Sequence, residues 1–195
     1  MANLCFVNMN ITAPKAEITK LYQELEIACN NTYHEKNWLG NLWLHLGYTF
    51  QDIINGTYGN CRGSICDFTL SAPNKITIDL DCSWQPRFKP IKDFLNQYAP
   101  KAKIEFEAEE PGFNLFTTSK TNINTVRVDI IDDVPENETY LLDWEGLHYK
   151  NTLHKNISKI LHKNNTIEAL ASEFENEHPC IAFRFFEHAD FNDYC

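Results

Sequence analysis

Four short stretches in which polar and apolar residues alternate are the strongest constraint on the fold of this chain. They cover residues 4–12, 66–70, 76–81 and 104–109. A period of two is typical of a β-strand with one buried face. Between them lie two segments with helical spacing. One follows Pro14, and the other spans about 88–99, ends before Pro100 and carries its apolar residues three and four apart.

The resulting order is strand–helix–strand–strand–helix–strand, which predicts an α+β, ferredoxin-like βαββαβ sandwich. Right-handed crossovers would place both helices on one face of a four-stranded antiparallel sheet. Residues 72–75 predict a hairpin turn between the two middle strands. An insertion at residues 30–61, rich in Gly, Asn and aromatic residues, separates the first helix from the second strand. Its centre, residues 42–44, fits a short helix or a short strand.

The remaining residues predict a less regular α/β extension. It has a strand at 126–130, an acidic connection at 132–146, helices near 153–161 and 167–174, and a final strand at 181–185. Neither an internal repeat nor a low-complexity linker interrupts the chain. We therefore expect one continuous globule with two sub-parts: residues 1–120, and an extension of residues 121–195 packed on them.

The charge of the chain is strongly acidic and local. The net charge is -10 over 195 residues, and residues 101–146 carry 4 basic and 11 acidic side chains, a net of -7. Such a chain is poorly suited to hold phosphates. The acidic segment suggests a basic partner or metal ions, or it only aids solubility. The first residues lack the basic and apolar regions of a signal peptide, so a cytoplasmic protein is expected.

The sheet face turned away from the helices should be polar. Alternation predicts that it displays Asn8, Asn10, Asp67, Thr69, Thr77, Asp79, Asp81, Glu105 and Glu107. This set contains five carboxylates and no aromatic residue, whereas RNA-reading sheets use aromatic and basic groups. Three interpretations remain open. The face docks a basic partner protein, it is covered by the C-terminal half, or it is simply solvated.

Two groups of side chains are possible metal ligands. Asp79 with Asp81, and Glu105 with Glu107, point the same way along their strands and could serve a divalent-metal nuclease. Polar-out alternation gives the same pattern without function. Among the seven cysteines, Cys61, Cys66 and Cys82 could suggest zinc, but the spacing is long and no second pair follows. We expect reduced, mostly buried thiols, with no metal and no cofactor.

Several short motifs support a resemblance that covers roughly residues 1–120. They are Thr12-Ala13-Pro14-Lys15, Trp38-Leu39-Gly40-Asn41, Cys61-Arg62-Gly63-Ser64, Ser83-Trp84-Gln85-Pro86 and Ala108-Glu109-Glu110-Pro111-Gly112. With these motifs the chain resembles the YubB/Api92-like ferredoxin-like family. The resemblance implies no catalytic residues. It implies a context, because such proteins are frequent on plasmids, phages and integrated elements.

Within these motifs, Trp84, Glu109, Glu110 and Gly112 are candidates for a special role. The structural alternative is that Trp84 packs at a strand end and that Gly112 supplies a turn.

These observations favour a non-enzymatic, protein-binding module of a phage or mobile element. Its most concrete form is an inhibitor of a host defence complex, such as an RNA-guided nuclease of the kind that anti-CRISPR proteins block. The expected partner is a basic protein surface, with no membrane contact and no catalytic residue. The partner-binding residues are predicted to be Asp79, Asp81, Trp84, Glu105, Glu107, Glu109 and Glu110.

Two alternatives belong to other functional classes. The first is a metal-dependent nuclease or hydrolase that uses the sheet carboxylates. The second is an RNA-binding protein that uses the aromatic insertion and a basic helix stripe, Lys155, Lys159 and Lys163 at i, i+4 and i+8. A stripe of this kind is also typical of a solvated helix face.

Overall fold

The computed structural model describes residues 3–30, 35–57, 61–113, 115–120, 123 and 125–195, and it is mixed α+β. It divides the chain into two compact units. Unit 1 comprises Met1–Lys120 and His188–Cys195, and unit 2 comprises Thr121–Glu187. The sequence-based division assigned all of residues 121–195 to the extension, whereas the structure assigns the last eight residues to unit 1.

The C-terminal residues belong to unit 1 because aromatic side chains anchor them in its core. Phe191 stacks on Phe88 with ring centroids 4.8 Å apart, and Tyr194 meets Phe88 and Phe106 edge to face. The Phe88 N–H also donates to the Tyr194 carbonyl oxygen at 3.0 Å. Aromatic pairs of this kind contribute beyond the apolar area they bury.

Unit 1 contains the predicted strand and helix order with additions. Its elements are β1 (Leu4–Thr12), α1 (Lys15–Cys29), α2 (Gly40–His45), α3 (Phe50–Asp52), the π-helix η1 (Ile53–Thr57), β2 (Gly63–Ala72), β3 (Lys75–Ser83), α4 (Lys89–Tyr98), β4 (Lys103–Glu110), the 3₁₀ turn η3 (Pro111–Phe113), β5 (Leu115–Thr118), β9 (Glu187–His188) and the 3₁₀ turn η5 (Phe191–Tyr194).

Sheet A of unit 1 has six strands in the order β2-β3-β1-β4-β5-β9. β1 lies in the middle and pairs antiparallel with β3 on one side and β4 on the other. The prediction of a four-stranded sheet is therefore wrong, because the sheet has two further strands. β5 extends it on the far side of β4, and β9 follows β5. Both added strands are too short for alternation to reveal them.

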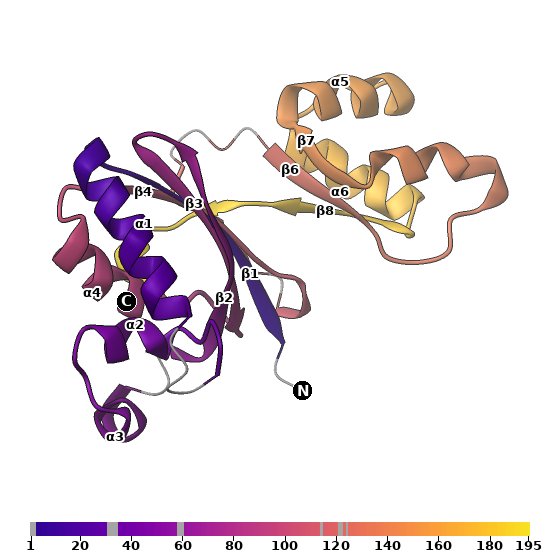
Figure 1. The fold of residues 1–195 in the computed structure, drawn as a ribbon. Helices are drawn as coiled ribbons and strands as arrows, with labels where there is room; N and C mark the ends of the chain where they lie inside the picture. Colours follow the sequence, from indigo (N-terminus) through magenta and orange to yellow (C-terminus); the bar gives the residue numbers. More distant parts are fainter. Residues whose placement is uncertain (1–2, 31–34, 58–60, 114, 121–122, 124) are drawn as a thin grey trace. The chain divides into compact units, whose positions relative to one another are not determined.

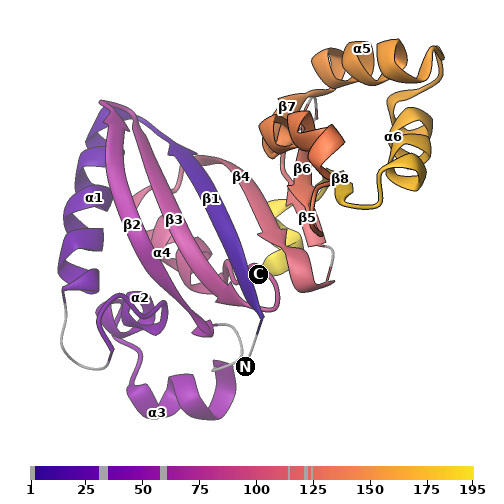
Figure 2. The ribbon, with the colours of Figure 1, turned by 90° about the vertical axis from the view of Figure 1, so that its right-hand side faces the viewer.

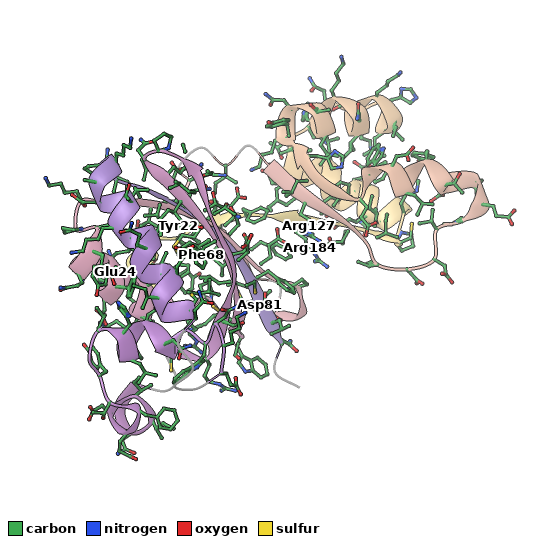
Figure 3. The ribbon with its side chains drawn as sticks, in the orientation of Figure 1. Tyr22, Glu24, Phe68, Asp81, Arg127 and Arg184 are labelled. Atoms are coloured by element: carbon green, nitrogen blue, oxygen red, sulfur yellow. The ribbon has the colours of Figure 1, made fainter. Side chains whose placement is uncertain are left out.

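Helices α1, α2 and α4 cover one face of sheet A (Figure 1). The strand residues on that face are the apolar ones, among them Val7, Met9, Ile76 and Phe106, all at most 2% exposed. Tyr22 of α1 meets Phe68 of β2 with ring centroids 5.4 Å apart (Figure 3). Burial of these apolar side chains is the main stabilising contribution to unit 1.

The insertion forms helices rather than strands in its described part. In α2, Leu42 and Trp43 are buried, and the Trp43 indole N–H donates to Asp93 of α4 at 2.9 Å. His45 lies 2.8 Å from the Glu24 carboxylate of α1. These contacts fasten the insertion to the helix layer. Residues 31–34 and 58–60, including Tyr58, lie outside the described residues.

Unit 2 is a small three-stranded α/β unit. Sheet B has the order β7-β6-β8, and β6 pairs antiparallel with both neighbours. Its predicted strands and helices are confirmed, whereas the 3₁₀ segment η4 occupies most of the acidic connection expected at 132–146, and the unpredicted strand β7 follows it. The elements are β6 (Thr125–Ile130), η4 (Glu136–Trp144), β7 (Gly146–Tyr149), α5 (Lys150–Leu161), α6 (Ile167–Glu177) and β8 (Ile181–Phe185).

Leu141 of η4 is fully buried in the core of unit 2, and two further contacts hold the segment there. Trp144 stacks on Phe174 of α6, with ring centroids 5.3 Å apart. The His178 ring nitrogen Nδ1 lies 2.8 Å from the Glu138 carboxylate. The acidic connection therefore packs on the core through buried Leu141, one aromatic residue and one ion-pairing residue.

Among the residues that the structure describes, none of the helices has both the length and the apolar character that crossing a membrane requires.

Candidate functional site: the open face of sheet A

The open face is the side of sheet A turned away from α1 and α4, and Figure 2 looks onto it. Strand alternation and register place all nine polar residues predicted for this face on it, and they add others, among them Leu4, Phe6 and Glu109. The nine are Asn8, Asn10, Asp67, Thr69, Thr77, Asp79, Asp81, Glu105 and Glu107.

Cross-strand pairing orders these residues into rows. Asn8 of β1 lies opposite Asp79 of β3 and opposite Glu107 of β4. Asp67 of β2 continues this row beyond Asp79. Four adjacent strands therefore contribute to one row, with an amide between its carboxylates. Directly opposite side chains in a sheet lie close enough to interact, so the charges of the row act on any bound molecule together.

Hydrogen bonds hold part of this surface in place. The Asn8 amide donates to Asp79 at 2.7 Å, and the Thr77 hydroxyl donates to Asn10 at 3.1 Å. Lys120 forms an ion pair with Glu107 at 2.6 Å. The amides of β1 separate the acidic strands β3 and β4, which reduces repulsion between their carboxylates.

The expectation that this face has no aromatic residue is wrong. Phe6 lies two residues before Asn8 on β1, so it shares the open face, and its side chain is 52% exposed. Leu4, two residues earlier, is 49% exposed. The alternation that located Asn8 and Asn10 extends to both residues, so the sequence contained the signal. Exposed large apolar side chains that gather on one surface are typical of interaction sites.

Trp84 lies at the same end of the sheet, directly after β3. Its backbone N–H donates to the Asn3 carbonyl oxygen at 3.0 Å, and its φ is 73°. A bulky residue in this left-handed region costs about 1–2 kcal/mol relative to the right-handed conformation. The side chain nevertheless remains 39% exposed. Packing at a strand end therefore accounts for Trp84 only in part.

Glu110 and Gly112 have structural roles. The side chain of Glu110 is 1% exposed, because Glu110 follows Glu109 and so points to the helix side of β4. We therefore remove Glu110 from the partner-binding set. A Cβ at Gly112 would come within 2.4 Å of Asn3 Nδ2 and 3.0 Å of Glu110 Oε1. Close packing, rather than the freedom of a turn, explains the glycine.

The cysteines considered for zinc lie in different environments. Cys61 and Cys82 are buried, whereas Cys66 is exposed at a bulge of β2. Burial raises the pKa of Cys61 to about 11 and that of Cys82 to about 12. Burial, and then the nearby Asp81, raise the pKa of Cys66 to about 11. These environments favour the thiol, whereas metal ligation requires the thiolate.

The carboxylates of the open face do not converge on a point. Within the described ranges, no group of three or more His, Cys, Asp or Glu side chains is arranged to hold a metal ion. Asp79 and Asp81 share a face but belong to different cross-strand rows. The same applies to Glu105 and Glu107.

The predicted basic stripe is shorter than expected. Helix α5 ends at Leu161, and His162 adopts a left-handed conformation with φ 53°. Lys163 therefore lies outside the helix, where it forms an ion pair with Glu173 that raises the pKa of its ammonium group. Only Lys155 and Lys159 remain as exposed cations one turn apart on α5.

The acidic segment of residues 101–146 is divided between the two units. Its glutamates from Glu105 to Glu110 belong to β4 of unit 1, and its acidic residues from Asp129 to Glu145 belong to unit 2. Within unit 1, Glu105, Glu107 and Glu109 of this segment lie on the open face of sheet A, whereas Glu110 points to the helix side.

Comparison with known proteins adds no relative. No protein-family model matches the chain, and neither the curated proteins nor the solved structures with which it was compared include a match.

Proposed function

We propose that the chain is a non-enzymatic protein-binding module, and that it docks a basic protein partner on the open face of sheet A. The observation that carries this proposal is the combination found at one end of that face. Exposed Leu4 and Phe6, with Trp84 nearby, lie next to the carboxylates of Asp81 and Glu109.

This combination matches the anatomy of protein–protein interfaces. Binding energy there comes mainly from a few aromatic or apolar anchors, and charged groups around them set specificity and the rate of association. Trp84 supports the proposal independently. A glycine would adopt its φ of 73° at lower cost, so a bulky exposed side chain at this position is consistent with a function outside the fold.

The proposal extends to the fold and to the class of partner. The order β2-β3-β1-β4 with α1 and α4 on one face supports a ferredoxin-like arrangement for the core of unit 1. The resemblance to proteins of mobile elements favours a cytoplasmic inhibitor of a host defence complex. RNA-guided nucleases fit this role because their nucleic-acid channels are basic. An acidic face would associate with such a channel by electrostatic attraction.

A pull-down with purified RNA-guided nuclease complexes tests the proposal. The tagged protein should retain at least one effector at 50 mM NaCl and lose it progressively towards 500 mM, because screening weakens contacts between charged surfaces. The double variant Asp81→Asn/Glu109→Gln should weaken retention about tenfold or more, since close charged pairs at an interface can be worth about 1.5 kcal/mol or more. Trp84→Gly should also weaken retention, without loss of thermal stability.

The matched control is Glu26→Gln/Asp133→Asn, which removes the same charge from exposed positions off the open face. It should bind like the unmodified protein. Equal weakening by the control would show that only net charge matters. If none of the purified effectors is retained even at 50 mM NaCl, the defence-inhibitor proposal is wrong.

The other two functional classes receive less support. The sheet carboxylates lie in separate rows, which does not favour a metal-dependent nuclease. The ion pair of Lys163 with Glu173 reduces the charge available for RNA. We therefore propose neither.

A further inference from the structure

We propose that Asp81, Phe6 and Glu109 form an acid–aromatic row that binds an arginine side chain of the partner. This inference rests on the proposed function, because it specifies the chemistry that the open face recognises.

The geometry of the row follows from the strand register. Phe6 of β1 lies directly opposite Asp81 of β3 and, on its other side, directly opposite Glu109 of β4. Opposite residues in antiparallel strands have Cβ atoms about 5 Å apart. The exposed ring of Phe6 is therefore flanked by one carboxylate on each side, within the width of three neighbouring strands.

A guanidinium group fits this arrangement better than an ammonium group. It is planar and weakly hydrated, so it can stack on an aromatic face while its N–H groups donate to a carboxylate beside the ring. A lysine ammonium is a compact, strongly hydrated charge that gains less from the ring. Leu4, on the same face of β1 and 49% exposed, offers apolar surface to the methylene groups of the arginine.

The neighbouring row lacks these features. Asn8 takes the position of the ring there, the Asn8 amide donates to Asp79, and Lys120 pairs with Glu107. In the acid–aromatic row, Cys66 interacts with Asp81, but a carboxylate can accept several further hydrogen bonds. The structure thus distinguishes the two rows by the side chain between their carboxylates, which is an exposed phenyl ring in one row and an amide in the other.

The negative charge of the chain also favours a basic protein as the molecule bound at this row. The chain carries a net charge of -10, so a second copy of it, or a nucleic acid, would be repelled by this face. A protein surface that presents arginine is attracted by it. A basic partner that presents only lysine would gain from charge but not from the ring.

The test compares two peptides of equal charge, acetylated and amidated tri-arginine and tri-lysine, in an NMR titration at 150 mM NaCl. Tri-arginine should shift amide signals of β1, β3 and β4 around the row. It should bind about two- to fivefold tighter than tri-lysine, the factor that a cation–π contact at an exposed site provides. Phe6→Leu should remove this preference while it retains the apolar character of the position.

Phe50→Leu is the matched control, because Phe50 is an exposed phenylalanine of α3 on another part of unit 1. It should retain the preference for arginine. Equal affinity for both peptides, or an unchanged preference in Phe6→Leu, would overturn the arginine site. If Asp81→Asn/Glu109→Gln still weakens effector retention in that case, docking of a basic partner survives. If it does not, the proposed function fails as well.

Discussion

Sheets A and B both bury one face against helices, but their outer faces carry different charged side chains. Each has an apolar face against its own helices and an outer face that carries the charged side chains of its strands together with exposed apolar or aromatic ones, Leu4 and Phe6 on sheet A and Leu147 and Tyr149 on sheet B. On sheet A, carboxylates of β3 and β4 flank the amides and the phenyl ring of β1. On sheet B, Arg127 of β6 lies directly opposite Arg184 of β8 (Figure 3). Both arginines approach Asp129.

The comparison shows that the charge of a segment does not predict the charge of a face. Unit 2 contains 6 basic and 12 acidic side chains, yet the charged residues on the outer face of its sheet include two arginines around one aspartate. The reason is positional. Only every second residue of a strand reaches a given face, so a few outward positions decide its sign.

The largest expected effect concerns the two cores. Phe174→Ala in unit 2 should destabilise that unit by about 3–5 kcal/mol, because Phe174 is fully buried and stacks on Trp144. In a hydrogen-exchange measurement, the backbone amides of β6, α6 and β8 should lose protection. Phe106→Ala is the matching change in unit 1, where protection should fall in β1, β3 and β4. Unchanged protection of the β6 and β8 amides in Phe174→Ala would contradict the expected destabilisation of unit 2.

The next effect addresses the arginine pair of sheet B. Asp129→Asn should destabilise unit 2 by about 1–3 kcal/mol, because it leaves two opposed guanidinium groups without the carboxylate that lies 2.7 Å from Arg127 Nε and 3.5 Å from Arg184 Nε. Urea unfolding measures it, and added NaCl should recover part of the loss by screening. Asp132→Asn, at an exposed position outside the strand, is the control and should have little effect. A loss of similar size in Asp132→Asn would contradict the specific role of Asp129.

A smaller effect is expected at the outer edge of sheet B. The Phe183 N–H donates to the Glu175 carboxylate at 2.6 Å, which shields this edge strand from other chains. Glu175→Gln keeps an acceptor and should cost little, whereas Glu175→Ala should cost about 1–2 kcal/mol. Thermal unfolding measures the cost. Light scattering should detect more self-association in the alanine variant, and no difference between the two variants would refute the capping role.

The last effect is absent at neutral pH and appears only in alkali, where unit 1 should lose stability. Burial raises the pKa of both Cys5 and Cys82 from 9.0 to about 12. The unfolded chain therefore loses these protons first, so the thiol contribution is complete below pH 9 and is lost as the pH rises from 9 to 12. Urea midpoints at pH 7, 9 and 10.5 should fall, and fall less steeply in Cys82→Ala. A Cys82→Ala slope equal to that of the unmodified protein would assign the loss to other groups.

Much of unit 1 could be predicted because its signals are local. The bounds of β1 and of the α4 helix follow from alternation, helical spacing and proline positions. β5, β7 and β9 could not be predicted, because each has four residues or fewer and is defined by its neighbours in space. The aromatic anchors Phe191 and Tyr194 acquire their role only beside Phe88.

For the candidate site, sequence alone placed the carboxylates of β3 and β4 on one face, because a strand has a strict period of two. Tertiary structure decided what that face is. Strand pairing put Phe6 between Asp81 and Glu109, turned Glu110 into the interior and separated Lys163 from its helix. Alternation acts within one strand, whereas a binding surface is made by side chains from several strands, and only the register between those strands brings them together.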